Sequence, residues 1–213
     1  MGELILCSHP IAAMPYYIDN ISLNVYSLEE LCYYIENHLY LIEADFMSEE
    51  LCLWIGQELD EKDLAQSLRS VLLGNGSLSD FTELILRSCG YCSEDTIRHI
   101  RSVLLDMQNK SVFECSKIRA DRYMESEKYV KAIHEYRKLL GMEEECKKNP
   151  VLEGNIRHNL GTACAELFLF DEAAANFLNA YRLNRNRESL AACMAACRLA
   201  KKTDILKKYK EEF

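Results

Sequence analysis

One stretch of the chain, residues 154–187, decides the fold, and it reads GNIRHNLGTACAELFLFDEAAANFLNAYRLNRNR. Small residues at Gly161, Ala173 and Ala180 allow two antiparallel helices to approach closely. The seam between the helices is filled by large apolar residues, namely Leu160, Phe170 and Phe177. Neither helix could bury its apolar side alone, so the stretch predicts a packed pair of helices.

This pattern resembles the tetratricopeptide repeat (TPR). In that family the first helix carries Leu-Gly, and an aromatic residue followed by Asp-Glu-Ala leads into the second helix. The residues that fall at the family's spacing are Leu160, Gly161, Phe170, Asp171, Glu172, Ala173, Phe177 and Ala180. The resemblance implies an all-α fold, in which antiparallel helix pairs form a TPR-like α–α superhelix.

Two weaker copies of the pattern flank this pair. The preceding copy has small and aromatic residues in the corresponding places, namely Ala120, Tyr123, Tyr129, Ala132, Tyr136 and Leu139. Ala132 and Ala173 are 41 residues apart, whereas the family repeats every 34 or so, about seven fewer. We expect residues 141–150 to hold the surplus, as a longer second helix or a loop. The third copy would have Ala195 at its small position, a turn at 201–204 and a final helix to Phe213.

The resemblance covers residues 111–213, and residues 1–110 are predicted to form a separate helical region that docks as a cap on the repeat stack. Its first 26 residues read as extended or irregular. The five residues expected to cap the following helices are Ser27, Ser48, Asp60, Ser79 and Ser93. Residues 15–34 look similar to helical proteins of anaerobic Gram-positive bacteria, a resemblance that implies a bacterial origin and no chemistry.

Composition and charge narrow the classes of function. Eight Gly and three Pro in 213 residues are few, which favours helices over strands. Residues 1–110 hold 6 Lys or Arg and 18 Asp or Glu, a net charge of −12, and residues 111–213 hold 19 and 16, a net charge of +3. The acidic first half disfavours binding to nucleic acid. The chain shows no secretory signal and no membrane-spanning run, so we expect a cytoplasmic protein that binds no membrane.

Ten cysteines are spread along the chain, and in a reducing compartment most are expected to be packed in the core. The sharpest exception is the Cys89-Gly90-Tyr91-Cys92 motif. A redox-active pair of this spacing needs its first thiol at a helix N-terminus, whereas Cys89 is expected to end a helix. Cys193 and Cys197, one helical turn apart, offer two further thiols for zinc. A thiol-dependent redox or zinc-binding protein that uses Cys89 and Cys92 is therefore the alternative function.

We expect no enzymatic activity and no cofactor. The sequence has no His-Glu-x-x-His pair, no nucleophile elbow and no phosphate-binding glycine loop. Its five histidines are far apart in sequence, so their spacing selects no catalytic set.

The resemblance implies instead a protein or peptide partner, bound in a groove lined by the first helix of each pair. The residues carried over to that groove by position are Lys117, Asp121, Met124, Asn155, His158, Asn159, Thr162 and Glu166. An ordinary solvated helix face is an equal alternative for any one of them. The sequence therefore predicts an adaptor, scaffold or chaperone-like module. Because the two halves carry opposite charge, a homodimer is a further hypothesis.

Overall fold

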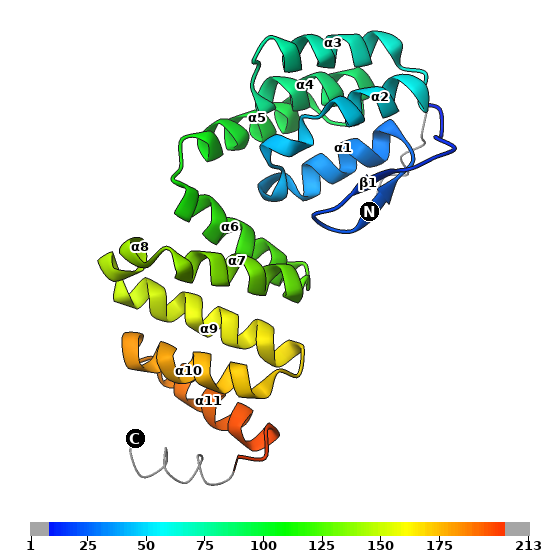
Figure 1. The fold of residues 1–213 in the computed structure, drawn as a ribbon. Helices are drawn as coiled ribbons and strands as arrows, with labels where there is room; N and C mark the ends of the chain where they lie inside the picture. Colours follow the sequence, from blue (N-terminus) through cyan, green and yellow to red (C-terminus); the bar gives the residue numbers. More distant parts are fainter. Residues whose placement is uncertain (1–8, 203–213) are drawn as a thin grey trace. The chain divides into compact units, whose positions relative to one another are not determined.

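The computed structural model describes residues 9–202, and the chain divides into two compact units, Met1–Lys110 (unit 1) and Ser111–Phe213 (unit 2). Within the described residues the fold is all-α: eleven α-helices, two short 3-10 helices and one two-stranded sheet (Figure 1). The all-α prediction is confirmed. The docking of unit 1 as a cap stays a prediction, as does the superhelix.

Between residues 9 and 110, unit 1 consists of a small hairpin followed by five α-helices and two 3-10 helices. The antiparallel strands β1 (Tyr16–Ile18) and β2 (Leu23–Val25) form within the segment expected to be extended. The helical elements that follow are α1 (Leu28–Asn37), η1 (Leu39–Leu41), η2 (Ala44–Phe46), α2 (Glu49–Gln57), α3 (Lys62–Leu73), α4 (Leu78–Cys89) and α5 (Glu94–Gln108). Helix α1 packs on α4, α2 on α3, and α4 on both α3 and α5. The buried apolar faces of these helices form the core of unit 1.

Three of the five predicted N-caps are confirmed. The hydroxyls of Ser27, Ser48 and Ser93 each accept a hydrogen bond from a backbone N–H in the first turn of the helix that follows. Asp60 was expected to cap α3, but the residue that precedes this helix is Glu61, which makes no side-chain capping bond. Asp60 instead adopts a left-handed conformation (φ 55°) and pairs with Lys62 at 2.7 Å.

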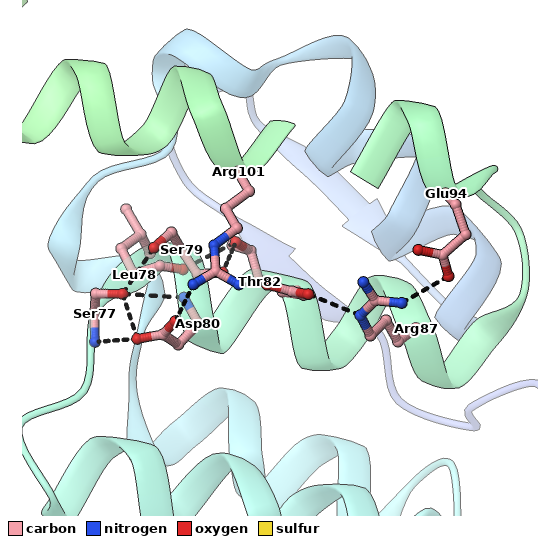
Figure 2. A network of polar contacts seen from close by, with 9 residues as sticks. Ser77, Leu78, Ser79, Asp80, Thr82, Arg87, Glu94 and Arg101 are labelled. Atoms are coloured by element: carbon pink, nitrogen blue, oxygen red, sulfur yellow. Dashed lines mark hydrogen bonds and ion pairs between the residues drawn. The ribbon is translucent and has the colours of Figure 1, made fainter. Parts of the chain in front are cut away.

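The prediction that Ser79 opens α4 is also wrong, because Ser77 caps this helix. The Ser77 hydroxyl accepts from the backbone N–H of Asp80 at 3.1 Å, and the Asp80 carboxylate accepts from the Ser77 N–H at 3.3 Å. Figure 2 shows this capping box together with Arg101, which reaches across from α5 and lies 3.4 Å from an Asp80 oxygen. Ser79 lies inside the helix and is buried. The cap and the arginine thus fix α4 and α5 at one corner of unit 1.

Unit 2 is a stack of antiparallel helices that lie side by side (Figure 1). Its elements are α6 (Val112–Glu125), α7 (Tyr129–Gly141), α8 (Glu143–Lys148), α9 (Pro150–Glu166), α10 (Phe170–Asn184) and α11 (Arg187–Leu199). The surplus between the first two pairs is neither a longer helix nor a loop alone, because it forms the separate six-residue helix α8. The final helix predicted to reach Phe213 lies outside the described residues.

The same turn closes three helices of unit 2, namely α6, α9 and α11. Glu127, Phe168 and Lys201 adopt left-handed conformations with φ of 58°, 61° and 57°. The N–H of the next residue then bonds a carbonyl five residues back in each turn: Lys128 to Tyr123 (2.8 Å), Leu169 to Cys164 (2.9 Å) and Lys202 to Cys197 (3.0 Å). Such bonds satisfy the orphan carbonyls of a helix end. Because the three turns are alike, α6, α9 and α11 occupy equivalent places, and we call them the first helices.

The turns also set the register of the third copy. Phe168 and Lys201 are 33 residues apart. The prediction for the third copy used the family's spacing of about 34, which pairs Ala195 with the small residue Gly161. Ala195 is accordingly exposed, whereas Cys193, the counterpart of Leu160, is fully buried. The placement of Ala195 at the small position is therefore wrong.

The seam between α9 and α10 is close-packed around Gly161. A Cβ at Gly161 would lie 2.9 Å from two ring carbons of Phe177, closer than real Cβ contacts, so glycine is what lets this ring approach. Leu160 and Phe177 are buried as predicted. Phe170 is only half-buried, and its ring lies edge-on against that of Phe168, so its place in the seam stays a prediction.

Candidate functional site: the face of the first helices

The first helices α6 and α9 are joined by a polar cluster centred on Asp121. Its Oδ1 accepts hydrogen bonds from the Tyr136 hydroxyl at 2.7 Å and from the Asn159 amide at 3.3 Å. Its Oδ2 pairs with the Lys117 ammonium at 2.5 Å, one turn earlier on α6. The structure thus brings together three residues that the sequence predicted for the groove: Lys117, Asp121 and Asn159.

Tyr136, on the second helix α7, holds this cluster from beneath. Its side chain is fully buried, and its hydroxyl also lies 3.3 Å from the Asn159 amide nitrogen. Burial and the bond to Asp121 raise the pKa of Tyr136 well above its ordinary value, so the hydroxyl stays protonated and donates. In the sequence analysis Tyr136 is only a packing residue of the repeat. A buried tyrosine hydroxyl usually has a hydrogen-bond partner, so a tyrosine at this packing position indicates a polar contact that the sequence analysis missed.

A second bridge joins α9 to α11. The His158 Nδ1 lies 2.9 Å from the hydroxyl of Ser189, which is fully buried, and the His158 ring packs on Phe177 with centroids 5.2 Å apart. Burial lowers the pKa of His158, which keeps the ring neutral near pH 7. Consecutive residues of α9 therefore turn to opposite neighbours, Asn159 toward α6 and His158 toward α11.

The remaining predicted residues lie along the same helices but make fewer contacts. Asn155 is exposed and accepts a hydrogen bond from Asn184 of α10 at 3.0 Å. The Thr162 hydroxyl bonds the carbonyl of His158 within α9 at 3.2 Å. Glu166 is exposed and Met124 is half-exposed. These four side chains extend the face beyond the two bridges without joining either.

Two hollows within the described part of unit 2 are lined by other residues. One, of about 300 Å³, lies at the start of α10 and is lined by Phe168, Leu169, Phe170, Asp171, Glu172 and Ala200. The other, of about 360 Å³, lies along α7 and is lined by Tyr123, Val130, Lys131, His134 and Glu135. The predicted groove residues line neither hollow, so what the structure places on the first helices is a polar face.

The Cys89-x-x-Cys92 motif lies at the corner between α4 and α5. Cys89 is the last residue of α4, and Gly90 follows it in the left-handed conformation expected for a helix end (φ 67°). A hydrogen bond from the Cys32 thiol of α1 lowers the pKa of Cys89, while burial raises the pKa of Cys92 to about 11. The thiol that lowers the pKa of Cys89 is therefore Cys32 of α1 and not Cys92. It was missed in the sequence analysis because Cys32 and Cys89 are far apart along the chain.

Most other cysteines are core residues, as predicted. Those buried within residues 9–202 are Cys32, Cys52, Cys146, Cys164, Cys193 and Cys197. Cys193 and Cys197 pack inside unit 2, and the Cys193 thiol donates to the Ala174 carbonyl at 3.4 Å.

Comparisons with models of protein families, with curated proteins and with solved structures gave no match. The helices between residues 9 and 202 include none that is long and apolar enough to cross a membrane.

Proposed function

We propose that unit 2 is a non-enzymatic protein–protein interaction module, an adaptor, scaffold or chaperone-like protein that binds a peptide or helix of a partner across its first helices. The observation that carries this proposal is the pair of bridges, Asp121 to Asn159 and His158 to Ser189. They link α6, α9 and α11 laterally, so residues far apart in sequence share one face. The three equivalent turns support a TPR-like superhelix, in which this face would be the concave one.

The order of the polar side chains suits recognition. Asp121 is held by three donors yet its side chain remains 35% exposed, and a carboxylate has about four sites for hydrogen bonds. An incoming backbone N–H or a cationic side chain can therefore bind a group that is already in place. Because ordering an interface side chain costs about 0.5–1.5 kcal/mol, a held side chain favours binding. Polar groups of this kind would set the register of a peptide, and apolar contacts would supply the affinity.

The test uses exposed residues, because His158 and Asn159 also hold the stack together. Asn155→Ala with Glu166→Lys changes two side chains of α9 without touching either bridge. Glu144→Lys on α8 is the matched control, since it reverses the charge of an exposed glutamate away from the first helices. The tagged full chain is used to capture proteins from its native cells, with quantitative mass spectrometry of what is retained.

We expect a partner that is retained by the wild type and by Glu144→Lys to be lost from the Asn155→Ala, Glu166→Lys variant, with equal melting temperatures for all three. Retention of the same proteins at the same level by all three chains would refute the assignment of the first helices as the binding face. A self-associated chain that dissociates with rising salt would favour the homodimer instead.

The alternative, a thiol-dependent protein, is favoured by one observation, the lowered pKa of Cys89. In that case the working thiol is Cys89, and Cys32 rather than Cys92 is the thiol that hydrogen-bonds it. Thiol titration of the reduced protein tests whether Cys89 is the reactive thiol. In that case Cys92→Ser would leave the fast-reacting thiol in place and Cys89→Ser would remove it.

A further inference from the structure

Three potential metal ligands from distant parts of the chain meet in unit 1. One ligand atom each of His9, Glu29 and Cys89 lies within 4.8 Å of the other two. Glu29 is buried, with only 7% of its side chain exposed, and the His9 ring is 18% exposed. An acidic side chain is rarely buried unless it is paired. Here it lies beside a sulfur and an imidazole nitrogen, which are the ligand types zinc prefers.

Glu29 and His9 hold each other in place. The Glu29 Oε1 accepts a hydrogen bond from the backbone N–H of His9 at 3.1 Å, and it lies 2.9 Å from the His9 Nδ1. The backbone bond does not involve the imidazole. The ring can therefore exchange its contact with the carboxylate for a metal while His9 remains attached to α1.

Cys32 can supply a fourth ligand, a second sulfur, from beside this group of three. Glu29 and Cys32 are three residues apart on α1, so both project from one face of the helix. The Cys32 thiol is fully buried and donates to the Ile85 carbonyl at 3.8 Å, one turn before the end of α4. It is also close enough to Cys89 to lower the pKa of that thiol. The packing of α1 on α4 thus brings the two thiols near each other, with Glu29 on the same face of α1 as Cys32.

We propose that His9, Glu29, Cys32 and Cys89 form a zinc-binding site in unit 1. Zinc binds cysteine sulfur, histidine nitrogen and carboxylate oxygen, and four such ligands complete the tetrahedral coordination that structural zinc takes. Bonds of about 2.0–2.3 Å in a tetrahedron separate the ligand atoms by roughly 3.3–3.8 Å. The His9, Glu29 and Cys89 ligand atoms lie within 4.8 Å of one another, so bringing these three to zinc requires movements of about an ångström. Cys32 lies outside that group of three, and its thiol would have to turn toward it to complete the set. Binding would release the protons of the thiols and tie the segment at His9 to α1 and α4.

Cobalt titration tests the site directly. The reduced, metal-free full chain is titrated with Co²⁺, whose tetrahedral thiolate complexes absorb in the near ultraviolet and visible, and Zn²⁺ is then added to displace it. We expect one Co²⁺ per chain with a thiolate charge-transfer band, and loss of that band on adding Zn²⁺. Cys89→Ser and His9→Gln each remove a ligand, and Cys92→Ser is the matched control because it removes a neighbouring thiol outside the set.

We expect Cys92→Ser to bind Co²⁺ as the wild type does. Cys89→Ser and His9→Gln should weaken binding by more than the 10- to 100-fold or so that loss of an outer-shell partner costs. Far-UV circular dichroism checks the fold of each variant. If Cys89→Ser does not fold, the Co²⁺ affinity of His9→Gln alone tests the site. The proposal is overturned if the wild type gives no thiolate band, if both ligand variants bind as the wild type does, or if Cys92→Ser loses binding to the same extent.

Discussion

Replacing Gly161 by alanine measures the close approach of α9 and α10. The added Cβ would lie 2.9 Å from the Cδ1 and Cε1 atoms of Phe177 and 3.1 Å from its Cγ. Ordinary contacts begin at 3.4 Å, and Phe177 is itself buried, so the ring cannot move away freely. Extra volume in a packed core costs about 1–3 kcal/mol. Alanine also favours a helix over glycine by about 1 kcal/mol, so we expect a net loss of about 0–2 kcal/mol in the free energy of unfolding.

Gly141→Ala is the matched control, because a Cβ at this residue, the last of α7, would meet nothing within 4 Å. The same substitution there is expected to stabilise the protein by about 0.4–1 kcal/mol. Both variants make the same change of residue type in a helix of unit 2. The difference between them, about 1–3 kcal/mol, therefore isolates the contact with Phe177.

Urea unfolding of the full chain is the assay. Trp54 is the only tryptophan and lies in unit 1, so its fluorescence follows unit 1, whereas far-UV circular dichroism follows the helices of both units. We expect Gly161→Ala to lower the midpoint of the dichroism transition and Gly141→Ala to raise it. If both variants were stabilised equally, the argument that glycine is required for helix contact at position 161 would be refuted.

Three further changes test the caps, the polar cluster and the buried histidine. Ser77→Ala removes the cap of α4 and is expected to cost about 0.5–2 kcal/mol, read from the urea midpoint of Trp54 fluorescence; an unchanged midpoint would contradict the capping assignment. Tyr136→Phe removes a buried donor to a carboxylate and is expected to lower the free energy of unfolding by about 1.5–3 kcal/mol. The same change in an Asp121→Asn background should lower it by less, and equal losses in the two backgrounds would show that the bond to Asp121 contributes nothing. Because burial lowers the pKa of His158 below its unfolded value of 6.5, its neutral form stabilises unit 2 above that pH, and stability is lost as pH falls through the lower folded pKa. Melting temperatures between pH 7.5 and pH 5, or thereabouts, should fall less steeply for His158→Gln than for the wild type, and parallel curves would refute this.

The sequence predicted the helices well where the signals are local. Ser27, Ser48 and Ser93 act within one turn of the helix they begin, so their roles follow from neighbouring residues alone. The error at α4 also has a local cause. Ser77 has an acidic residue three positions later, Asp80, which favours it as the cap over Ser79, whose corresponding residue is Thr82.

The sites depend on contacts between distant residues, which spacing along one chain does not reveal. Asp121 and Asn159 were both expected on the groove, but their bond requires α6 and α9 to be neighbours with α7 beneath them. For the proposed zinc site, the three-residue spacing of Glu29 and Cys32 on α1 indicates from the sequence that both lie on one face of the helix. His9 was not predictable, because it precedes the first helix and reaches Glu29 across 20 residues of chain.

The two bridges of α9 make recognition and stability dependent on each other in unit 2. In a stack each element contacts mainly its neighbours, and α9 bonds the first helix on either side through two consecutive residues, His158 and Asn159. A partner lying across α6, α9 and α11 would bind only when both bridges are formed. It would therefore stabilise unit 2 by an amount that grows with its concentration, about 2.7 kcal/mol at one hundred times its dissociation constant. Zinc bound at Cys89 would act on unit 1, so the transition followed by Trp54 separates the two effects.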